Sequence, residues 1–210
     1  QKENKINIFP EGIDIVTGGF PCQDFSVSGK RMGFDTDKGH NGKKIDINAP
    51  TVENRGHLYM WMREVIAITK PKMFIAENVK GMMTLHKGQI FKRIIKAFEE
   101  VGYTTYTQLF NAADYGVPQK RERVIIVGIR NDLNDIMEYS FPKETNKNNW
   151  VPLSVAVSEL AIKQEKYYFS ERAVQGMKNA KNNMKRGLYQ DLNKPCLTVT
   201  SHLAKVSLNS

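Results

Sequence analysis

Three kinds of reactive side chain stand at the ends of apolar runs in the sequence. Cys22 lies in "GGFPCQ", Glu77 in "FIAENV", and Arg121 and Arg123 lie two positions apart in "QKRERV". A cysteine thiolate can attack an electron-poor carbon atom, and a carboxyl group kept protonated by burial can act as an acid near neutral pH. Two arginines at the start of one strand should point to the same side. Together these groups could attack, protonate and hold an electron-poor ring.

Each of these residues also has a plainer explanation. A single cysteine is commonly a small buried apolar residue, Glu77 could cap a helix or form a salt bridge, and the arginines could form a solvated basic edge. The second cysteine, Cys196, has no carboxyl or arginine motif beside it, so we assign it to packing. The two cysteines are far apart and lack metal-ligand spacing, so the sequence predicts neither a disulfide framework nor a metal site.

Apolar periodicity places these groups in an alternating order of strands and helices. The predicted strands, each a short apolar run, cover residues 12–20, 72–79, 103–110 and 123–130. Helices are predicted over residues 57–70 and 88–103, the second ending at Gly102. Their apolar faces consist of Leu58, Met62, Val65, Ile66 and Thr69 in the first, and Ile90, Phe91, Ile94, Ile95 and Phe98 in the second. We therefore expect an α/β layered sheet with a buried strand before Cys22 and with ligands at the carboxyl ends of strands.

Two stretches depart from this pattern. The polar segment 26–56 is interrupted by glycines and too irregular for a packed element, and loops of such length in compact domains are usually functional or disordered. Beyond Asn131 the chain is rich in asparagine and lysine, with short apolar islands. We place a domain boundary there and expect a smaller, loop-rich module to follow.

Composition limits the class of protein. The chain has 210 residues, of which 40% are hydrophobic, so it can bury a real core. No apolar run approaches the roughly 20 residues that a membrane span needs, and the first residues lack the apolar core of a signal peptide. We expect a cytoplasmic protein. The net charge of +9 fits either a polyanionic partner or a solvated basic surface.

The motifs "GGFPCQDFSVSG", "ENVKG" and "QKRERV", in this order, resemble those of the cytosine-5 DNA methyltransferases of bacterial restriction-modification systems. "RGHLY" and "NAADYGVPQ" are similar to further blocks of that family, and "NKPCLTVTSHLAKVSLNS" is similar to the end of its target-recognition region. The resemblance implies part of a Rossmann-like methyltransferase sheet followed by a loop-rich target-recognition module. Residues 1–131 would be a partial catalytic domain and residues 132–210 a partial target-recognition region.

The resemblance also implies a reaction, the transfer of a methyl group from S-adenosylmethionine to carbon 5 of a cytosine flipped out of double-stranded DNA. Cys22 would attack carbon 6, Glu77 would contact ring nitrogen 3 and the exocyclic amine, Arg123 would hold the ring carbonyl, and Arg121 would support the loop or the DNA backbone. The segment after Cys22 would close over the DNA. The resemblance assigns Pro21, Gln23, Ser28, Asn78 and Gln119 to substrate binding, Pro21 and Leu58 to the methyl donor, and no residue to a metal.

The family's glycine-rich donor turn and final motifs are not found in the sequence. We therefore expect the middle of a longer enzyme, monomeric when full length, and no methylation by the chain alone. Two alternatives stay open: a non-catalytic DNA-binding or complementing fragment of a split enzyme, and an RNA cytosine-5 methyltransferase. The module after Asn131 favours DNA as the substrate.

Overall fold

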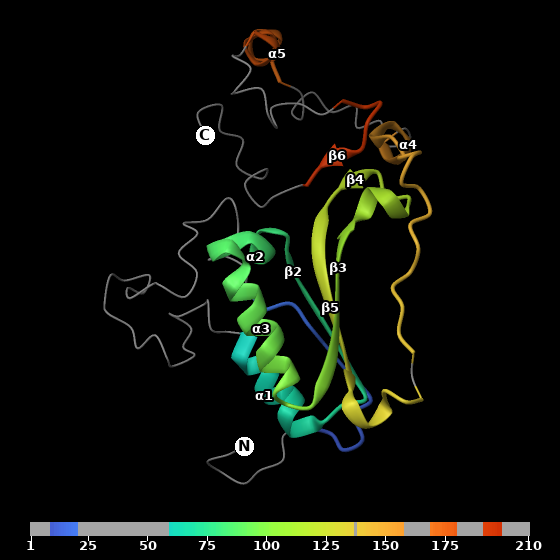
Figure 1. Ribbon diagram of the computed structural model, residues 1–210. Coiled ribbons are helices and arrows are strands. Elements are labelled where there is room, and N and C mark those ends of the chain that lie inside the picture. Colours follow the sequence, from blue (N-terminus) through green and yellow to red (C-terminus); the bar gives the residue numbers. More distant parts are fainter. Residues whose placement is uncertain (1–8, 21–58, 137, 158–168, 180–190, 199–210) are drawn as a thin grey trace, which may run out of the picture. The chain divides into compact units, whose positions relative to one another are not determined.

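The structure is a computed structural model that describes residues 9–20, 59–136, 138–157, 169–179 and 191–198 (Figure 1). The chain divides into two compact units, each of which is described by itself. The first consists of Gln1–Phe110 and Glu122–Phe141, and the second of Asn111–Arg121 and Pro142–Ser210. No helix within the described ranges has both the length and the apolar character needed to cross a membrane.

A four-stranded sheet forms the first unit. Its strands are β1 (Ile15–Gly18), β2 (Met73–Val79), β5 (Glu122–Arg130) and β3 (Tyr103–Asn111), in this spatial order. Strand β1 runs parallel to β2, and β2 runs antiparallel to β5. All four predicted strands are present, and the predicted α/β class is confirmed. The antiparallel pairing sets Glu77 opposite Ile125 and Val79 opposite Arg123, so the glutamate and arginine motifs meet at one end of the sheet.

Helices α1 (Tyr59–Thr69) and α3 (Gln89–Glu99) lie on the same side of this sheet (Figure 1). Helix α2 (Gly81–Thr84) and the 3-10 turn η2 (Leu85–Gly88) connect β2 to α3, and a second 3-10 turn, η4 (Asn131–Leu133), follows β5. The predicted stripe of α3 is confirmed, because every fourth residue is buried, namely Ile90, Ile94 and Phe98. Gly102 follows the helix with a φ of 96° and donates its N–H to the carbonyl oxygen of Glu99, which makes it the expected stop signal.

The core between the helices and the sheet is centred on Phe74. Its ring lies 4.7 Å from that of Phe98 and 5.3 Å from that of Tyr103, measured between ring centroids. Gly128 on β5 lies directly beneath Phe74, since a Cβ atom added there would be only 1.9 Å from a ring carbon. Tyr103 also donates its hydroxyl to the carbonyl oxygen of Pro71 at 2.7 Å, and burial raises its pKa to about 12. These contacts fix β2 against α3.

The strand that leads toward Cys22 differs from the prediction. We expected a buried strand, but the Ile15 side chain of β1 is 54% exposed and Thr17 is exposed as well. Within the described residues β1 pairs with β2 on one side only, so it is an edge strand. An apolar run predicts a strand, but the run itself does not show whether neighbours cover both of its edges.

The second unit consists of short elements. They are the 3-10 turn η3 (Ala112–Tyr115), the strands β4 (Gln119–Lys120) and β6 (Cys196–Leu197), and the helices α4 (Leu153–Val157) and α5 (Glu171–Lys178). Strands β4 and β6 run parallel, and the Thr198 hydroxyl donates to the carbonyl oxygen of Lys120 at 2.8 Å. The Lys120 ammonium lies 4.4 Å from the centre of the Trp150 ring, whose N–H donates to Asp114. Residues 111–121 thus belong to this unit although they precede Asn131.

Candidate active site

The carboxylate of Glu77 and the guanidinium of Arg123 form an ion pair at one end of the sheet. Arg123 on β5 stands opposite Val79 on β2. Glu77, two residues before Val79, is therefore the diagonal neighbour of Arg123 on the same face of the sheet. The Arg123 Nε atom lies 2.6 Å from Glu77 Oε1, with the arginine side chain 21% exposed and the glutamate side chain 43% exposed. Arg123 also donates from Nη1 to the carbonyl oxygen of Glu122 at 2.8 Å. Two predicted catalytic groups therefore lie in direct contact.

The environment of Glu77 differs from the one that we expected. The sequence predicted a buried carboxyl group that stays protonated. The side chain of Glu77 is instead 43% exposed and paired with the guanidinium of Arg123. The reason is the alternation of side chains along a strand, which turns Phe74, Ala76 and Asn78 toward the helices and Glu77 toward the other face. The Glu77 carboxylate is therefore held in an ion pair with Arg123 and is not enclosed in apolar surroundings.

Asn78 is buried on the helix-covered face, with 1% of its surface exposed. Its Nδ2 atom donates to the carbonyl oxygen of Phe20 at 3.1 Å, and its Oδ1 atom accepts the backbone N–H of Val79 at 2.8 Å. Phe20 is itself buried, and its ring makes an edge contact with Tyr59 at 6.3 Å between centroids. The side chain of Asn78 thus joins the ends of β1 and β2.

The two glycines after β1 allow the chain to pass close to its neighbours. A Cβ atom on Gly19 would lie 3.4 Å from Glu77 Oε2, and one on Gly18 would lie 3.0 Å from the sulfur atom of Met62. Oε2, the carboxylate oxygen that is not paired with Arg123, therefore faces the exit from β1. Cys22 follows Gly19 by three positions in the chain. Five of the predicted site residues lie outside the described residues, namely Pro21, Cys22, Gln23, Ser28 and Leu58.

Gln119 and Arg121 belong to the second unit. Gln119 lies in β4 opposite Cys196, and its side-chain Nε2 atom is 3.6 Å from the Cys196 sulfur. Cys196 is a buried free thiol, which confirms its packing role. Arg121 is exposed between β4 and β5, and its carbonyl oxygen accepts the N–H of Ala112 at 3.1 Å. Arg121 and Arg123 therefore do not share a strand, contrary to the prediction that both stand at the start of one strand.

One ion pair between the two motifs was not predicted from the sequence. Lys80 of "ENVKG" lies 2.8 Å from Glu122 of "QKRERV", with both side chains about half exposed. Like Glu77 and Arg123, these residues join the end of β2 to the start of β5. The sequence contains the charges for such a pair, because each motif carries one acidic and at least one basic residue. Only the antiparallel register of β2 and β5 shows which of these residues meet.

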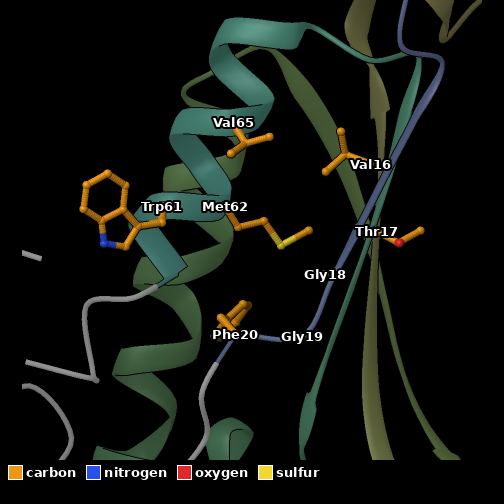
Figure 2. Close-up of a pocket in the computed structure, with 8 residues that line it drawn as sticks. All are labelled: Val16, Thr17, Gly18, Gly19, Phe20, Trp61, Met62 and Val65. Atoms are coloured by element: carbon orange, nitrogen blue, oxygen red, sulfur yellow. The ribbon is translucent and has the colours of Figure 1, made fainter. Parts of the chain in front are cut away.

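A pocket of about 340 Å³ opens between β1 and α1 (Figure 2). Figure 2 shows Met62 and Val65 extending from α1 toward the strand, whereas the Trp61 ring projects away from it at the edge of the pocket. The eight lining residues are Val16, Thr17, Gly18, Gly19, Phe20, Trp61, Met62 and Val65. None of the eight carries a charge, so the pocket suits an apolar group. The predicted core face of this helix included Met62 and Val65 but not Trp61, which is 56% exposed.

Comparison with known proteins identifies several relatives. The family model for the C-5 cytosine-specific DNA methylases matches residues 1–207. The type II methyltransferase M.BspRI of Lysinibacillus sphaericus is 38% identical over 169 residues, which cover 78% of this chain and 35% of that relative. The type II methyltransferase M1.ScrFI of Lactococcus lactis subsp. cremoris is 33% identical over 174 residues, covering 82% of this chain and 39% of the relative. The chain thus spans well under half the length of either protein.

Among solved structures, the Dnmt2 methyltransferase of S. pombe superimposes with a TM-score of 0.49 and 13% sequence identity. The superposition covers 90% of this chain and 52% of that one.

Proposed function

The chain belongs to the C-5 cytosine-specific DNA methylase family, and we propose that it carries the catalytic residues of a DNA (cytosine-5-)-methyltransferase. The substrates would be S-adenosylmethionine and a cytosine flipped out of double-stranded DNA. The observation that supports this function most strongly is the ion pair of Glu77 and Arg123 beside the exit from β1, from which the chain continues to Cys22.

The reaction begins with the Cys22 thiolate, which forms a bond to carbon 6 of the cytosine. The electron pair of the 5,6 double bond then becomes available at carbon 5, as in an enamine. S-adenosylmethionine supplies the methyl group to that carbon and leaves as S-adenosylhomocysteine. Loss of the proton from carbon 5 returns an electron pair to the ring, the 5,6 double bond forms again, and the thiolate leaves.

Glu77 and Arg123 divide the contacts to the ring between them. Oε1 of Glu77 pairs with Arg123, whereas Oε2 faces the exit from β1 and can contact ring nitrogen 3 and the exocyclic amine. Arg123 uses Nε for Glu77 and Nη1 for a backbone carbonyl oxygen, so among the described residues Nη2 is the nitrogen left for the ring carbonyl. As attack places negative charge on the ring, a proton carried on Oε2 of Glu77 moves to ring nitrogen 3 and returns when the thiolate leaves, while the Arg123 guanidinium balances the charge on the ring carbonyl.

The pocket between β1 and α1 fits only part of the methyl donor. Its lining supplies apolar side chains such as Trp61 and Met62, which can pack against an apolar portion of the donor, but no charged group for its methionine end. Pro21 and Leu58 would add to this site by resemblance. We assign residues 1–131 to the catalytic domain and residues 132–210 to target recognition, with Gln119 bracing the site and Arg121 supporting the loop or the DNA backbone.

The test is covalent trapping on duplex DNA that carries 5-fluorocytosine, in which fluorine replaces the proton that must leave carbon 5. In the presence of S-adenosylmethionine, the full-length methyltransferase that contains this chain should form a stable adduct with this DNA, because fluorine cannot leave carbon 5 after methyl transfer, and Cys22→Ala should form none while still binding DNA. Cys196→Ser is the matched control, because it removes the other thiol, and it should keep the adduct. An adduct with Cys22→Ala would refute the covalent role, and faster methylation of transfer RNA than of duplex DNA would refute the substrate.

A further inference from the structure

We propose that Asn78 is a positioning residue for the nucleophile Cys22. Its side-chain amide holds the carbonyl oxygen of Phe20 and so fixes the direction in which the chain leaves β1. The inference rests on the proposed function, because it takes Cys22 to be the attacking thiol. It differs from the substrate-binding role that the resemblance implied for Asn78, because the buried side chain would act through the backbone of Phe20 and not on the reacting ring.

The side-chain amide of Asn78 is buried among apolar side chains. Its neighbours on this face of the sheet, Phe74, Ala76, Val124 and Ile126, are apolar and fully buried. Apart from the hydroxyl groups of Tyr59 and Tyr103, Asn78 has the only strongly polar side chain among the buried residues that the structure describes. Burying an amide is unfavourable unless its donors and acceptors are bonded, and an apolar side chain would fill the same space without that requirement. The hydrogen bonds of Asn78 therefore explain its presence better than packing does.

Of the two hydrogen bonds, only one reaches another element. The bond from the Val79 N–H to Oδ1 is local, between adjacent residues. The bond from Nδ2 to the Phe20 carbonyl oxygen joins residues 58 positions apart in the sequence. It is made at the residue before Pro21, where the described part of β1 and its exit ends. Asn78 thus acts on the last backbone carbonyl before the Pro-Cys-Gln motif.

Phe20 is held at two points, which makes it a firm support for the next residues of the chain. Its carbonyl oxygen is bound by Asn78, and its ring is buried against Tyr59. Cys22 is only two residues further along the chain, and the residue between them is a proline, whose ring removes one backbone rotation. Few free dihedral angles therefore separate the anchored carbonyl from the thiol. Loss of the Asn78 bond should loosen this support without removing any group that touches the cytosine.

Adjacent residues of β2 would then have separate roles on the two faces of the sheet. Glu77 directs its carboxylate to Arg123 and to the exit from β1, whereas Asn78 binds the backbone of that exit from the helix-covered side. The variants Glu77→Gln and Asn78→Asp should therefore both slow attack, the first through the ring and the second through the thiol.

The experiment compares Asn78→Asp with Tyr103→Phe in the full-length methyltransferase that contains this chain. Asn78→Asp keeps the acceptor for Val79 and removes the donor to Phe20. Tyr103→Phe also removes one buried hydrogen bond from a side chain to a backbone carbonyl, but at Pro71, before the other end of β2. Asn78→Leu, which is uncharged and has the same number of side-chain heavy atoms, removes the donor to Phe20 together with the acceptor for Val79, and it is used if the buried charge of aspartate prevents folding.

Two measurements are made on each variant. For the Asn78 variants, the rate of adduct formation on 5-fluorocytosine DNA and kcat should fall by about 10- to 100-fold, because small displacements of a reacting group have effects of that size. The KM for DNA should stay within about twofold, because contacts to DNA are unchanged. Hydrogen exchange in peptides spanning residues 15–24 should become faster in the Asn78 variants and stay unchanged in Tyr103→Phe.

The outcomes separate this inference from the proposed function. Equal adduct rates and equal exchange in the Asn78 variants and in Tyr103→Phe would overturn the positioning role and leave Asn78 as a stabilising residue only. An unmodified protein that forms no adduct would overturn the proposed function, whereas the exchange measurement would still show whether Asn78 holds the exit from β1.

Discussion

Replacement of Gly128 by alanine should destabilise the first unit by steric conflict with Phe74. A Cβ atom at this position would lie 1.9, 2.4 and 2.6 Å from three atoms of the Phe74 ring. Carbon atoms in contact prefer a separation of about 3.5–4.0 Å, so the ring would have to retreat by roughly 1.6 Å or more. Phe98 and Tyr103 lie against the same ring and oppose that movement. We expect a loss of about 3 kcal/mol in the free energy of unfolding, the upper part of the range for overpacked cores.

The assay is urea denaturation followed by circular dichroism, with the slope m checked for each variant. Gly176→Ala is the matched control, because it makes the same change in helix α5, where no atom lies within 4 Å of the added Cβ. It should be neutral or stabilising by up to about 1 kcal/mol, the helix propensity difference. Phe74→Leu combined with Gly128→Ala should cost less than the sum of the single changes, by about 1–2 kcal/mol of coupling. A cost of under about 0.5 kcal/mol for Gly128→Ala alone, the size of an ordinary surface substitution, would refute the reasoning.

Three further predictions concern charge and ionisation. Glu77→Gln should lower kcat for methylation by about 10²- to 10⁴-fold, as expected for a group that exchanges a proton with the ring. The control is Asp14→Asn, which breaks the exposed ion pair with Lys72 and should leave steady-state kinetics unchanged. Because burial raises the pKa of Tyr103 to about 12, its neutral form favours the folded state, and stability should fall as the pH rises from about 10 toward 12. Denaturation midpoints should show that decline in the unmodified protein and a weaker one in Tyr103→Phe. DNA binding should weaken steeply with added salt, since the net charge of +9 favours phosphate contacts, and a flat titration would exclude that contribution.

Elements with a sustained local pattern could be predicted from the sequence. Helix α3 repeats Ile90, Ile94 and Phe98 at four-residue intervals, and such spacing places apolar side chains on one face whatever the rest of the fold does. The strands β2 and β5 have seven and nine residues and contain the apolar runs "MFIA" and "VIIVGI", which are long enough to indicate a buried strand. The end of β2 then placed Glu77 and Asn78 at the candidate site.

Features that depend on distant partners could not be predicted. The exposure of Ile15 depends on which strands flank β1, and the pairing of Glu77 with Arg123 depends on the register between β2 and β5. Strands β4 and β6 have two residues each, too few to show any period. The position of Arg121 outside a strand results from the same break between β4 and β5. In each case the deciding contact joins residues far apart in the chain, which composition and spacing do not encode.

The pairing of β4 with β6 also constrains when the arginine motif can become ordered. Gln119 meets Cys196 across 77 positions of sequence, and the Lys120 carbonyl oxygen is bound by Thr198 across 78. Contacts of such long range form late in folding, because the loop that they close must first lose its freedom. During synthesis on the ribosome, Gln119 emerges long before its partner strand exists. The beginning of the "QKRERV" segment therefore reaches its final position only after the chain has been made past Thr198, so a nascent chain that ends earlier lacks this support.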